Sequence, residues 1–159
     1  MRKYLALIGS FVLGLVLLTG PAYANDIVYA EATVQWRLVS PVEVELPGTN
    51  IVFLRLRAES TEMSVFAHRE LIYRRLGDVL QASLQAGVPL TGEDVRVVLP
   101  GEIEDVQLKY PAVFVADQLV IEVDPVHAAI NRSTQEGLAR VWARNLGRAL
   151  DVWAELNFR

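Results

Sequence analysis

The sequence predicts an α+β domain, an antiparallel-rich sheet with two long amphipathic helices on one face. Polar and apolar residues alternate through much of residues 33–58, as they do in half-buried strands. Two later stretches instead repeat apolar residues at spacings of three and four, as amphipathic helices do. Several short strand-like runs lie between these stretches, which favours α+β over a regular α/β alternation. The expected topology is ferredoxin-like or a duplicated strand-helix module.

The N-terminus has the three-part layout of a secretory signal peptide. Arg2 and Lys3 precede an uncharged apolar stretch, and Gly20-Pro21 leads to the small-x-small triplet Ala22-Tyr23-Ala24. The apolar stretch is shorter than the ~20 residues that a transmembrane helix needs. We therefore expect residues 1–24 to be removed and residues 25–159 to form one domain.

Residues 33–58 predict a strand followed by an antiparallel hairpin. Apolar side chains occupy alternate positions on both sides of the turn sequence Pro47-Gly48-Thr49-Asn50, and Pro41 interrupts the first run. Trp36 lies on the apolar face of that run, so we expect it in the core.

The apolar pattern also predicts the register of the hairpin. If both apolar faces point to the core, Val44 lies opposite Leu54 and Glu43 lies opposite Arg55. This register leaves a three-residue loop, Gly48 to Asn50, which is a common hairpin length.

Two long helices are predicted, over 64–86 and from a cap at Ser133 to the C-terminal region. Gly87 ends the first, and Glu136 is expected to complete a capping box with Ser133. The expected buried residues of the first are Val65, Ile72, Leu76, Val79, Leu80 and Leu84; those of the second are Leu138, Val141, Trp142, Leu146, Leu150 and Trp153.

The helices share the pattern R-x-L-G-x-x-L at an offset of 70 residues, which is the basis for suspecting a duplicated module. A glycine in a helix lowers its stability by about 1 kcal/mol, so Gly77 and Gly147 suggest close packing of helix on sheet or of helix on helix. Between the helices, strands are expected at 95–99, more weakly through 106–108, and as a hairpin at 113–123 around Ala116-Asp117. A single helical turn is expected at 125–131.

Composition excludes several classes of function. The chain has 159 residues, no Cys and a net charge of −4, which becomes −6 without residues 1–24 because that segment holds two basic and no acidic residues. Cysteine nucleophiles and thiolate metal sites are absent, and an acidic chain gives no electrostatic case for nucleic acid. We expect export to a periplasm or a thylakoid lumen, where disulfides are optional.

No residue pattern predicts a catalytic, cofactor or metal site. His68 and His127 are expected at the surface, and Asp124 with His127 supplies at most two of the three ligands that a metal site needs. The acidic run Glu102 to Asp105 lacks the order of a calcium loop and predicts a solvated turn. None of the common hydrolase, phosphate-binding or dinucleotide motifs is present. The chain is therefore expected not to be an enzyme.

Arg140, Arg144 and Arg148 are the candidate contact residues. They recur every four residues and form a basic line on the outer face of the last helix, suited to an acidic partner or anionic lipid. Glu136 and Asp151 are expected to neutralise part of this line, so a solvated helix face remains the alternative.

The stretch Ala112 to Leu150 resembles the periplasmic N-terminal region of some cyanobacterial MscS-like mechanosensitive channel proteins. The resemblance lies in the hairpin VFVADQLVIEV and in the helix pattern LA..WA..L..AL, and residues 50–80 resemble the module that precedes it. This chain has no membrane helices after the resembling part, so the resemblance implies an extracytoplasmic contact module without channel activity.

We expect a non-enzymatic binding or accessory module with a protein or membrane-associated partner. The alternative is a carrier that holds a small ligand or lipid in a cleft between sheet and helices, and an enzyme with unrecognised residues comes third. A carrier needs a sizeable apolar pocket, whereas an accessory module needs a functional outer surface.

Overall fold

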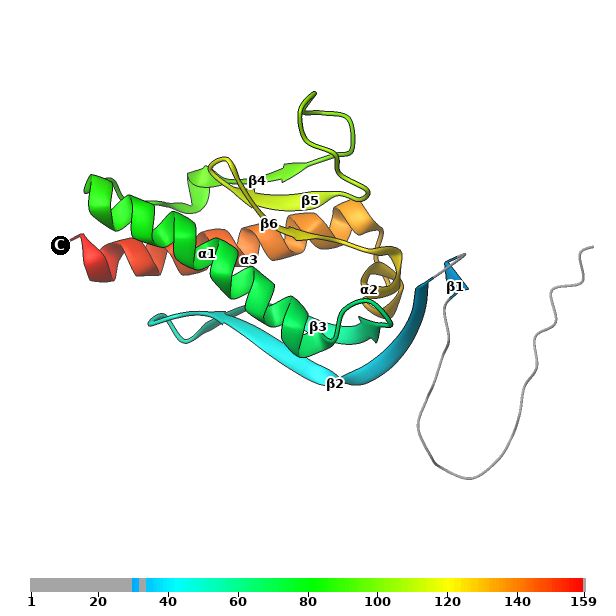
Figure 1. The fold of residues 1–159 in the computed structure, drawn as a ribbon. Coiled ribbons are helices and arrows are strands. Elements are labelled where there is room, and N and C mark those ends of the chain that lie inside the picture. Colours follow the sequence, from blue (N-terminus) through cyan, green and yellow to red (C-terminus); the bar gives the residue numbers. More distant parts are fainter. Residues whose placement is uncertain (1–29, 32–33, 159) are drawn as a thin grey trace, which may run out of the picture.

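The computed structural model describes residues 30–31 and 34–158, and these residues confirm the α+β class (Figure 1). The predicted signal peptide, residues 1–24, lies outside the described residues. Within them, no helix has the length and apolar character needed to cross a membrane. The elements in chain order are β1 (Ala30–Glu31), β2 (Val34–Leu46), β3 (Ile51–Ser60), α1 (Val65–Ala86), the 3-10 turn η1 (Gly92–Asp94), β4 (Val95–Val98), β5 (Ala112–Val115), β6 (Gln118–Glu122), α2 (Pro125–Ile130) and α3 (Gln135–Asn157).

The strands form two antiparallel sheets, in the orders β1-β2-β3 and β4-β5-β6. The sequence predicted that both long helices would lie on one face of a single sheet. The structure differs. Helix α1 contacts β2, β3 and β6, and α3 contacts β3, β4 and β5, so both helices join the two sheets (Figure 1). A ferredoxin-like sheet would require the strands of both halves to pair. Side chains of α2 and α3 instead bond the outer edge of β3, where Arg57 N–H donates to His127 and Phe53 C=O accepts from Asn145.

The hairpin register is the predicted one, with Val44 opposite Leu54 and Glu43 opposite Arg55. Arg55 Nε lies 2.8 Å from Glu43 Oε1 on the outer face. Closer to the turn the register shifts, because Phe53 has no partner in β2, and the loop is therefore the four residues 47–50 rather than three. This bulge lets two consecutive side chains, Phe53 and Leu54, both enter the core.

Pro41 does not end its strand. Strand β2 continues through it, and the pairing shifts between Leu38 and Val42, where two extra residues of β2 are accommodated. Proline has no backbone N–H to donate to a neighbouring strand. It is tolerated here because the regular hydrogen bonding between β2 and β3 is interrupted at this position. Trp36 lies beyond this shift and is half-buried outside the main core, contrary to the expectation.

The ends of both long helices are set by side chains. Ser64 Oγ accepts from Ala67 N at 3.2 Å, and Gly87 ends α1 with a φ of 67°. The N-cap of α3 is Thr134 rather than Ser133, with Thr134 Oγ1 3.0 Å from Gly137 N. Glu136 does not complete the capping box expected with Ser133, because its carboxylate binds Arg140 one turn later.

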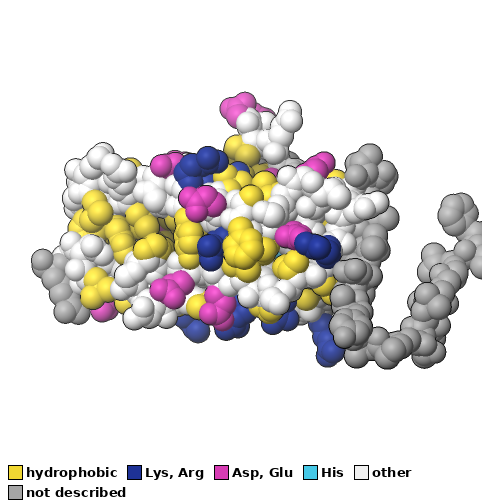
Figure 2. All heavy atoms as spheres, turned by 60° about the horizontal axis from the view of Figure 1, so that its bottom comes forward, with side chains coloured by type: hydrophobic (Ala, Val, Ile, Leu, Met, Phe, Trp, Pro, Cys, Tyr) yellow, Lys and Arg dark blue, Asp and Glu magenta, His cyan; other side chains and the backbone are white. Residues whose placement is uncertain are grey.

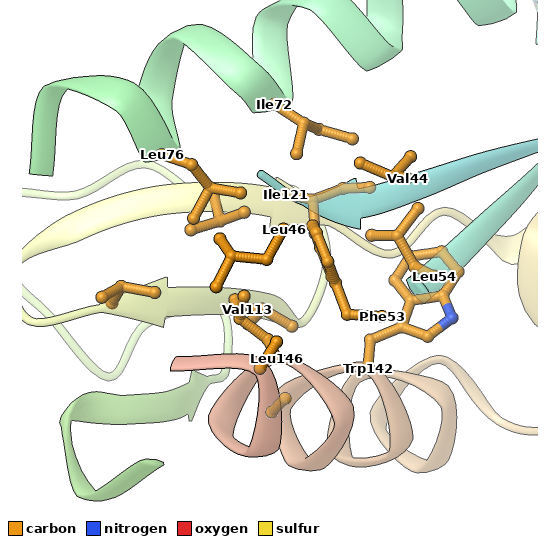
Figure 3. Close-up of a cluster of buried hydrophobic side chains, with 14 of the residues drawn as sticks. Val44, Leu46, Phe53, Leu54, Ile72, Leu76, Val113, Ile121, Trp142 and Leu146 are labelled. Atoms are coloured by element: carbon orange, nitrogen blue, oxygen red, sulfur yellow. The ribbon is translucent and has the colours of Figure 1, made fainter. Parts of the chain in front are cut away.

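The core lies where the two helices and the two sheets meet (Figure 3). Trp142 and Trp153 are buried, as predicted. Leu84 and Val141 are exposed instead of buried, and Ser83 takes the inward position next to Leu84. The close-up labels the following contributors: Val44, Leu46, Phe53, Leu54, Ile72, Leu76, Val113, Ile121, Trp142 and Leu146.

The two glycines of the shared helix pattern lie in different surroundings. A Cβ on Gly147 would lie 3.1 Å from Gly92 Cα, so the predicted close packing occurs there, although the partner of α3 is the turn η1 and not a sheet or the other long helix. A Cβ on Gly77 would meet nothing within 4 Å, so the prediction was wrong for α1. The weak strand expected at 106–108 is a loop, and its Val106 and Leu108 pack on a small cluster against the outer side of the β4-β5-β6 sheet.

Candidate functional site

A cleft of about 330 Å³ lies between the β2-β3 hairpin, α1 and β6. The two sheets and the helix each supply part of its wall, so its shape depends on how the two sheets are joined. Its lining combines apolar side chains with charged ones: Val34, Trp36, Ala58, Ser60, Glu62, Met63, His68, Leu71, Arg75, Lys109, Tyr110, Glu122 and Asp124.

Asp124 and His127 form a buried hydrogen-bonded pair next to the cleft. Asp124 caps α2, and its Oδ1 accepts from the His127 backbone N–H at 2.8 Å. Its Oδ2 lies 2.6 Å from His127 Nδ1, and the Arg57 backbone N–H donates to His127 Nε2 at 3.2 Å. Because Nε2 accepts, the ring proton is on Nδ1 and is donated to Asp124. Both ring nitrogens are thus used within the fold.

His127 is fully buried, so the expectation of a surface histidine was wrong. The sequence does contain the relevant signal, because Asp124-Pro125 combines a preferred N-cap residue with proline at the first helical position. That combination places the third residue, His127, with its backbone N–H against the aspartate. The strand partner of the imidazole, Arg57, lies 70 residues earlier and cannot be found from the local pattern.

Hydrogen bonding decides the charge of Asp124. Burial alone would raise the pKa of its carboxyl group, but the hydrogen bonds from the ring and backbone of His127 outweigh burial and hold that pKa below its ordinary value of 3.8. Asp124 is therefore ionised at neutral pH, and both of its carboxylate oxygens are hydrogen-bonded to His127.

His68 is half-buried in the wall of the cleft, again contrary to the expectation of a surface residue. Burial, helped by the nearby His127 and Arg75, lowers its pKa from 6.5 to about 4, although the charge of Asp124 acts in the opposite direction. The imidazole is therefore neutral at neutral pH. Its ring centroid lies 6.4 Å from that of His127.

Arg75 is a half-buried cation in the same wall. Its Nη1 donates to the Val120 carbonyl oxygen at 3.1 Å, and within the described part of the chain it makes no ion pair. Burial lowers its pKa, while the negative charge of Glu122 partly opposes that effect. A guanidinium has five N–H donors, so most of its donor capacity is unused among the residues that the structure describes.

The neighbouring acidic group already has partners. Glu122 Oε2 accepts from the backbone N–H groups of Lys109 and Tyr110, at 2.9 and 3.0 Å, and so holds the loop before β5. Lys109 Nζ lies 4.9 Å from the centre of the Tyr110 ring, a cation-π distance.

The arginine line of α3 is exposed and lies outside the cleft. Arg140 pairs with Glu136, as expected. Asp151 does not neutralise Arg148, because its carboxylate accepts from Gly92 N–H at 2.7 Å. Arg144 and Arg148 therefore have no ion-pair partner among residues 30–31 and 34–158.

Elsewhere the surface is mixed. Figure 2 shows acidic, basic and hydrophobic side chains interspersed over the face that it presents. The exposed large hydrophobic residues include Phe66 and Leu84 on α1 and Val88 just after it. No group of three His, Asp or Glu side chains suited to a metal ion occurs in the described residues, and the Glu102 to Asp105 run lies in turns.

Comparison with protein-family models, with curated proteins and with solved structures gives no match. No relative therefore supplies a function, and these comparisons give no link to the channel proteins that part of the sequence resembles. The function has to be inferred from the geometry.

Proposed function

We propose that this protein is a non-enzymatic binding protein that holds a small molecule in the cleft beside α1. The observation that carries the proposal is the cleft itself, because about 330 Å³ falls within the usual range of small-molecule sites. Six of its thirteen lining residues are apolar or aromatic and seven are polar or charged, so it offers contacts to both an apolar body and a polar group of a ligand. Asp124 and His127 serve the fold, since each ring nitrogen of the histidine has a partner there.

Filling the cleft tests this proposal. Leu71 lines the cleft, whereas Leu84 lies on the same helix with 49% of its surface exposed and does not line it. We expect Leu71→Trp to remove small molecules that co-purify with the protein from its native host, detected by native mass spectrometry. Leu84→Trp should retain them. An empty wild-type protein, or equal loading of both variants, would contradict the proposal.

The layout of residues 1–24 supports the further proposal that the protein is exported to a periplasm or a thylakoid lumen. We expect the mature protein to begin at Asn25. Measurement of the intact mass of protein from the native host checks this, and a species that keeps Met1 to Ala24 would overturn it.

A second candidate function is that of an accessory module that contacts a partner through α3. It is favoured by one observation, that Arg144 and Arg148 are exposed without an ion-pair partner in the described structure, beside the exposed Val141. Such a surface suits an anionic lipid surface or an acidic protein.

Substitution of both arginines by glutamine distinguishes this contact role from a solvated helix face. If the arginines only face water, stability should change by no more than about 0.5 kcal/mol and association should not change. If they form a contact, the folded variant should lose binding to vesicles that contain anionic lipid or to its protein partner. Binding of the wild type should then weaken with added salt. Binding that resists both salt and the substitutions rules out the contact role.

A further inference from the structure

Arg75 distinguishes the cleft from a purely apolar pocket. It extends from the middle of α1 into a wall that also contains the apolar side chains of Trp36 and Leu71. It is half-buried, and its hydrogen bond to Val120 C=O uses one donor of the guanidinium. A cation that is partly removed from water and has no counter-ion is unfavourable, and an anion beside it would relieve this.

The anion does not come from the neighbouring described residues. Asp124 is bound to His127, and Glu122 is bound to the backbone N–H groups of Lys109 and Tyr110. Glu122 is close enough to influence Arg75 electrostatically but does not form an ion pair with it.

We propose that the cleft binds a small apolar monocarboxylate, with the carboxylate on Arg75 and the apolar body against Trp36 and Leu71. This inference rests on the proposed binding function and names the class of ligand. A planar guanidinium matches a carboxylate through two parallel N–H···O bonds. The apolar part gains free energy by leaving water, and an aromatic ring gains further by packing on Trp36.

Charge favours a monoanion over a dianion such as a phosphate ester. The lining has two cationic side chains, Arg75 and Lys109, and three carboxylates, Glu62, Glu122 and Asp124. A second negative charge would face these carboxylates without a second unengaged cation, since Lys109 already lies over the ring of Tyr110. The single charge of a carboxylate needs only Arg75.

Phenylacetate, phenylacetamide and phenethylamine test the charge preference, because they share an aromatic body and carry a negative, a zero and a positive charge. We expect phenylacetate to bind the wild-type protein at least about tenfold more tightly than either analogue in isothermal titration calorimetry, as hydrogen bonds to charged groups allow. Hexanoate, measured alongside, shows whether the apolar body is bound as an aromatic ring or as an alkyl chain.

The matched variants are Arg75→Gln and Arg74→Gln. Arg74 is the adjacent residue, exposed and outside the cleft. Affinity for phenylacetate should fall about tenfold or more in Arg75→Gln and stay unchanged in Arg74→Gln. Because Arg75 also bonds Val120, Arg75→Lys is included as a charge-retaining variant, and it should recover part of the affinity.

The outcomes separate the two proposals. Equal binding of phenylacetamide and phenylacetate, or tighter binding of phenethylamine, overturns the carboxylate assignment but leaves a ligand site in the cleft. The same follows if phenylacetate binds equally well to wild type and to a folded Arg75→Gln. If no probe binds the wild type and Leu71→Trp removes no co-purifying molecule, the binding function itself is wrong.

Discussion

His127 holds together three parts of the chain that are far apart in sequence. Its ring bonds Asp124 at the start of α2 and the backbone of Arg57 in β3, and its ring edges lie near Trp36 and Trp142, with centroids 6.2 and 6.1 Å away. His127 also accepts a hydrogen bond from the Arg57 backbone N–H at the outer edge of β3. Without this bond, the N–H would be available to pair with another strand. One imidazole therefore fixes both a helix start and a sheet edge.

Replacement of His127 by Ala should lower the free energy of unfolding by about 3 to 5 kcal/mol. The change removes the ring partners of Asp124 Oδ2 and of the Arg57 backbone N–H, while the backbone N–H of residue 127 still donates to Asp124 Oδ1. A buried polar group left without a partner costs about 1 to 3 kcal/mol, more if it is charged, and the cavity left by the ring adds to that cost. Asn145→Ala is the control, since it removes one hydrogen bond to the same strand and should cost about 1 kcal/mol. Urea denaturation measures both. Equal losses would show that Asp124 and Arg57 find other partners.

The neutral state of His68 makes stability depend on pH. Its pKa is about 4 in the folded protein and 6.5 ordinarily, so between these values the unfolded chain binds more protons. The free energy of unfolding should fall as the pH is lowered from 6.5 to 4, by at most about 1.4 kcal/mol per pH unit. Asp124, with a lowered pKa, adds a further loss as the pH falls below its ordinary value of 3.8.

Chemical denaturation at pH 7, 5.5 and 4.5 checks this dependence. His68→Gln should be less sensitive to pH over that window than the wild type. An unchanged slope in His68→Gln would assign the pH dependence to other groups.

At the scale of single elements, much of the structure follows from the sequence. The register of the β2-β3 hairpin, the start and end of α1 and the turn between β5 and β6 all follow from local patterns. The differences come from contacts that are distant in sequence. Asp151, for example, is turned away from Arg148 by Gly92, 59 residues earlier. The bulge at Phe53 is an exception, because it is a local irregularity of the hairpin.

Gly77 and Gly147 allow a matched test of such a distant contact. Gly77→Ala should raise the free energy of unfolding by about 0.5 to 1 kcal/mol, because alanine favours the helix and the added methyl group meets nothing. Gly147→Ala should lower it by about 1 kcal/mol or more, because the methyl group would press on the backbone of Gly92. Thermal unfolding of both variants measures these changes. Higher stability in both variants would mean that η1 can move away from the added methyl group without a loss of stability.

At the scale of the molecule, the sequence predicted the class but not the division into two sheets or the existence of the cleft. Periodicity shows which residues of a strand face inward, yet it does not show which strands pair. The cleft draws on β2, β3, α1 and β6, so it is visible only after the two sheets are joined. Arg75 and His68 accordingly show no sign of a site in their local sequence.

The two sheets should unfold together. Each long helix packs on strands of both, so the two sheets share the main core, and only a small cluster belongs to the β4-β5-β6 sheet alone. Far-UV circular dichroism and tryptophan fluorescence should give coincident urea transitions. Two separated transitions would show that one sheet and its part of the helices are stable alone.

The position of α3 in the chain has a consequence for synthesis. Among the described elements, α3 comes after all the strands in the chain, yet it covers β3. Phe53 in β3 and its hydrogen-bond partner Asn145 in α3 are 92 residues apart. While the ribosome is still making residues 135–157, the surfaces of β3, β4 and β5 that α3 covers lack that cover, although α1 has already been made. Contacts between residues so distant in sequence also slow folding. We therefore expect the nascent chain to be prone to aggregation until residues 135–157 have been made.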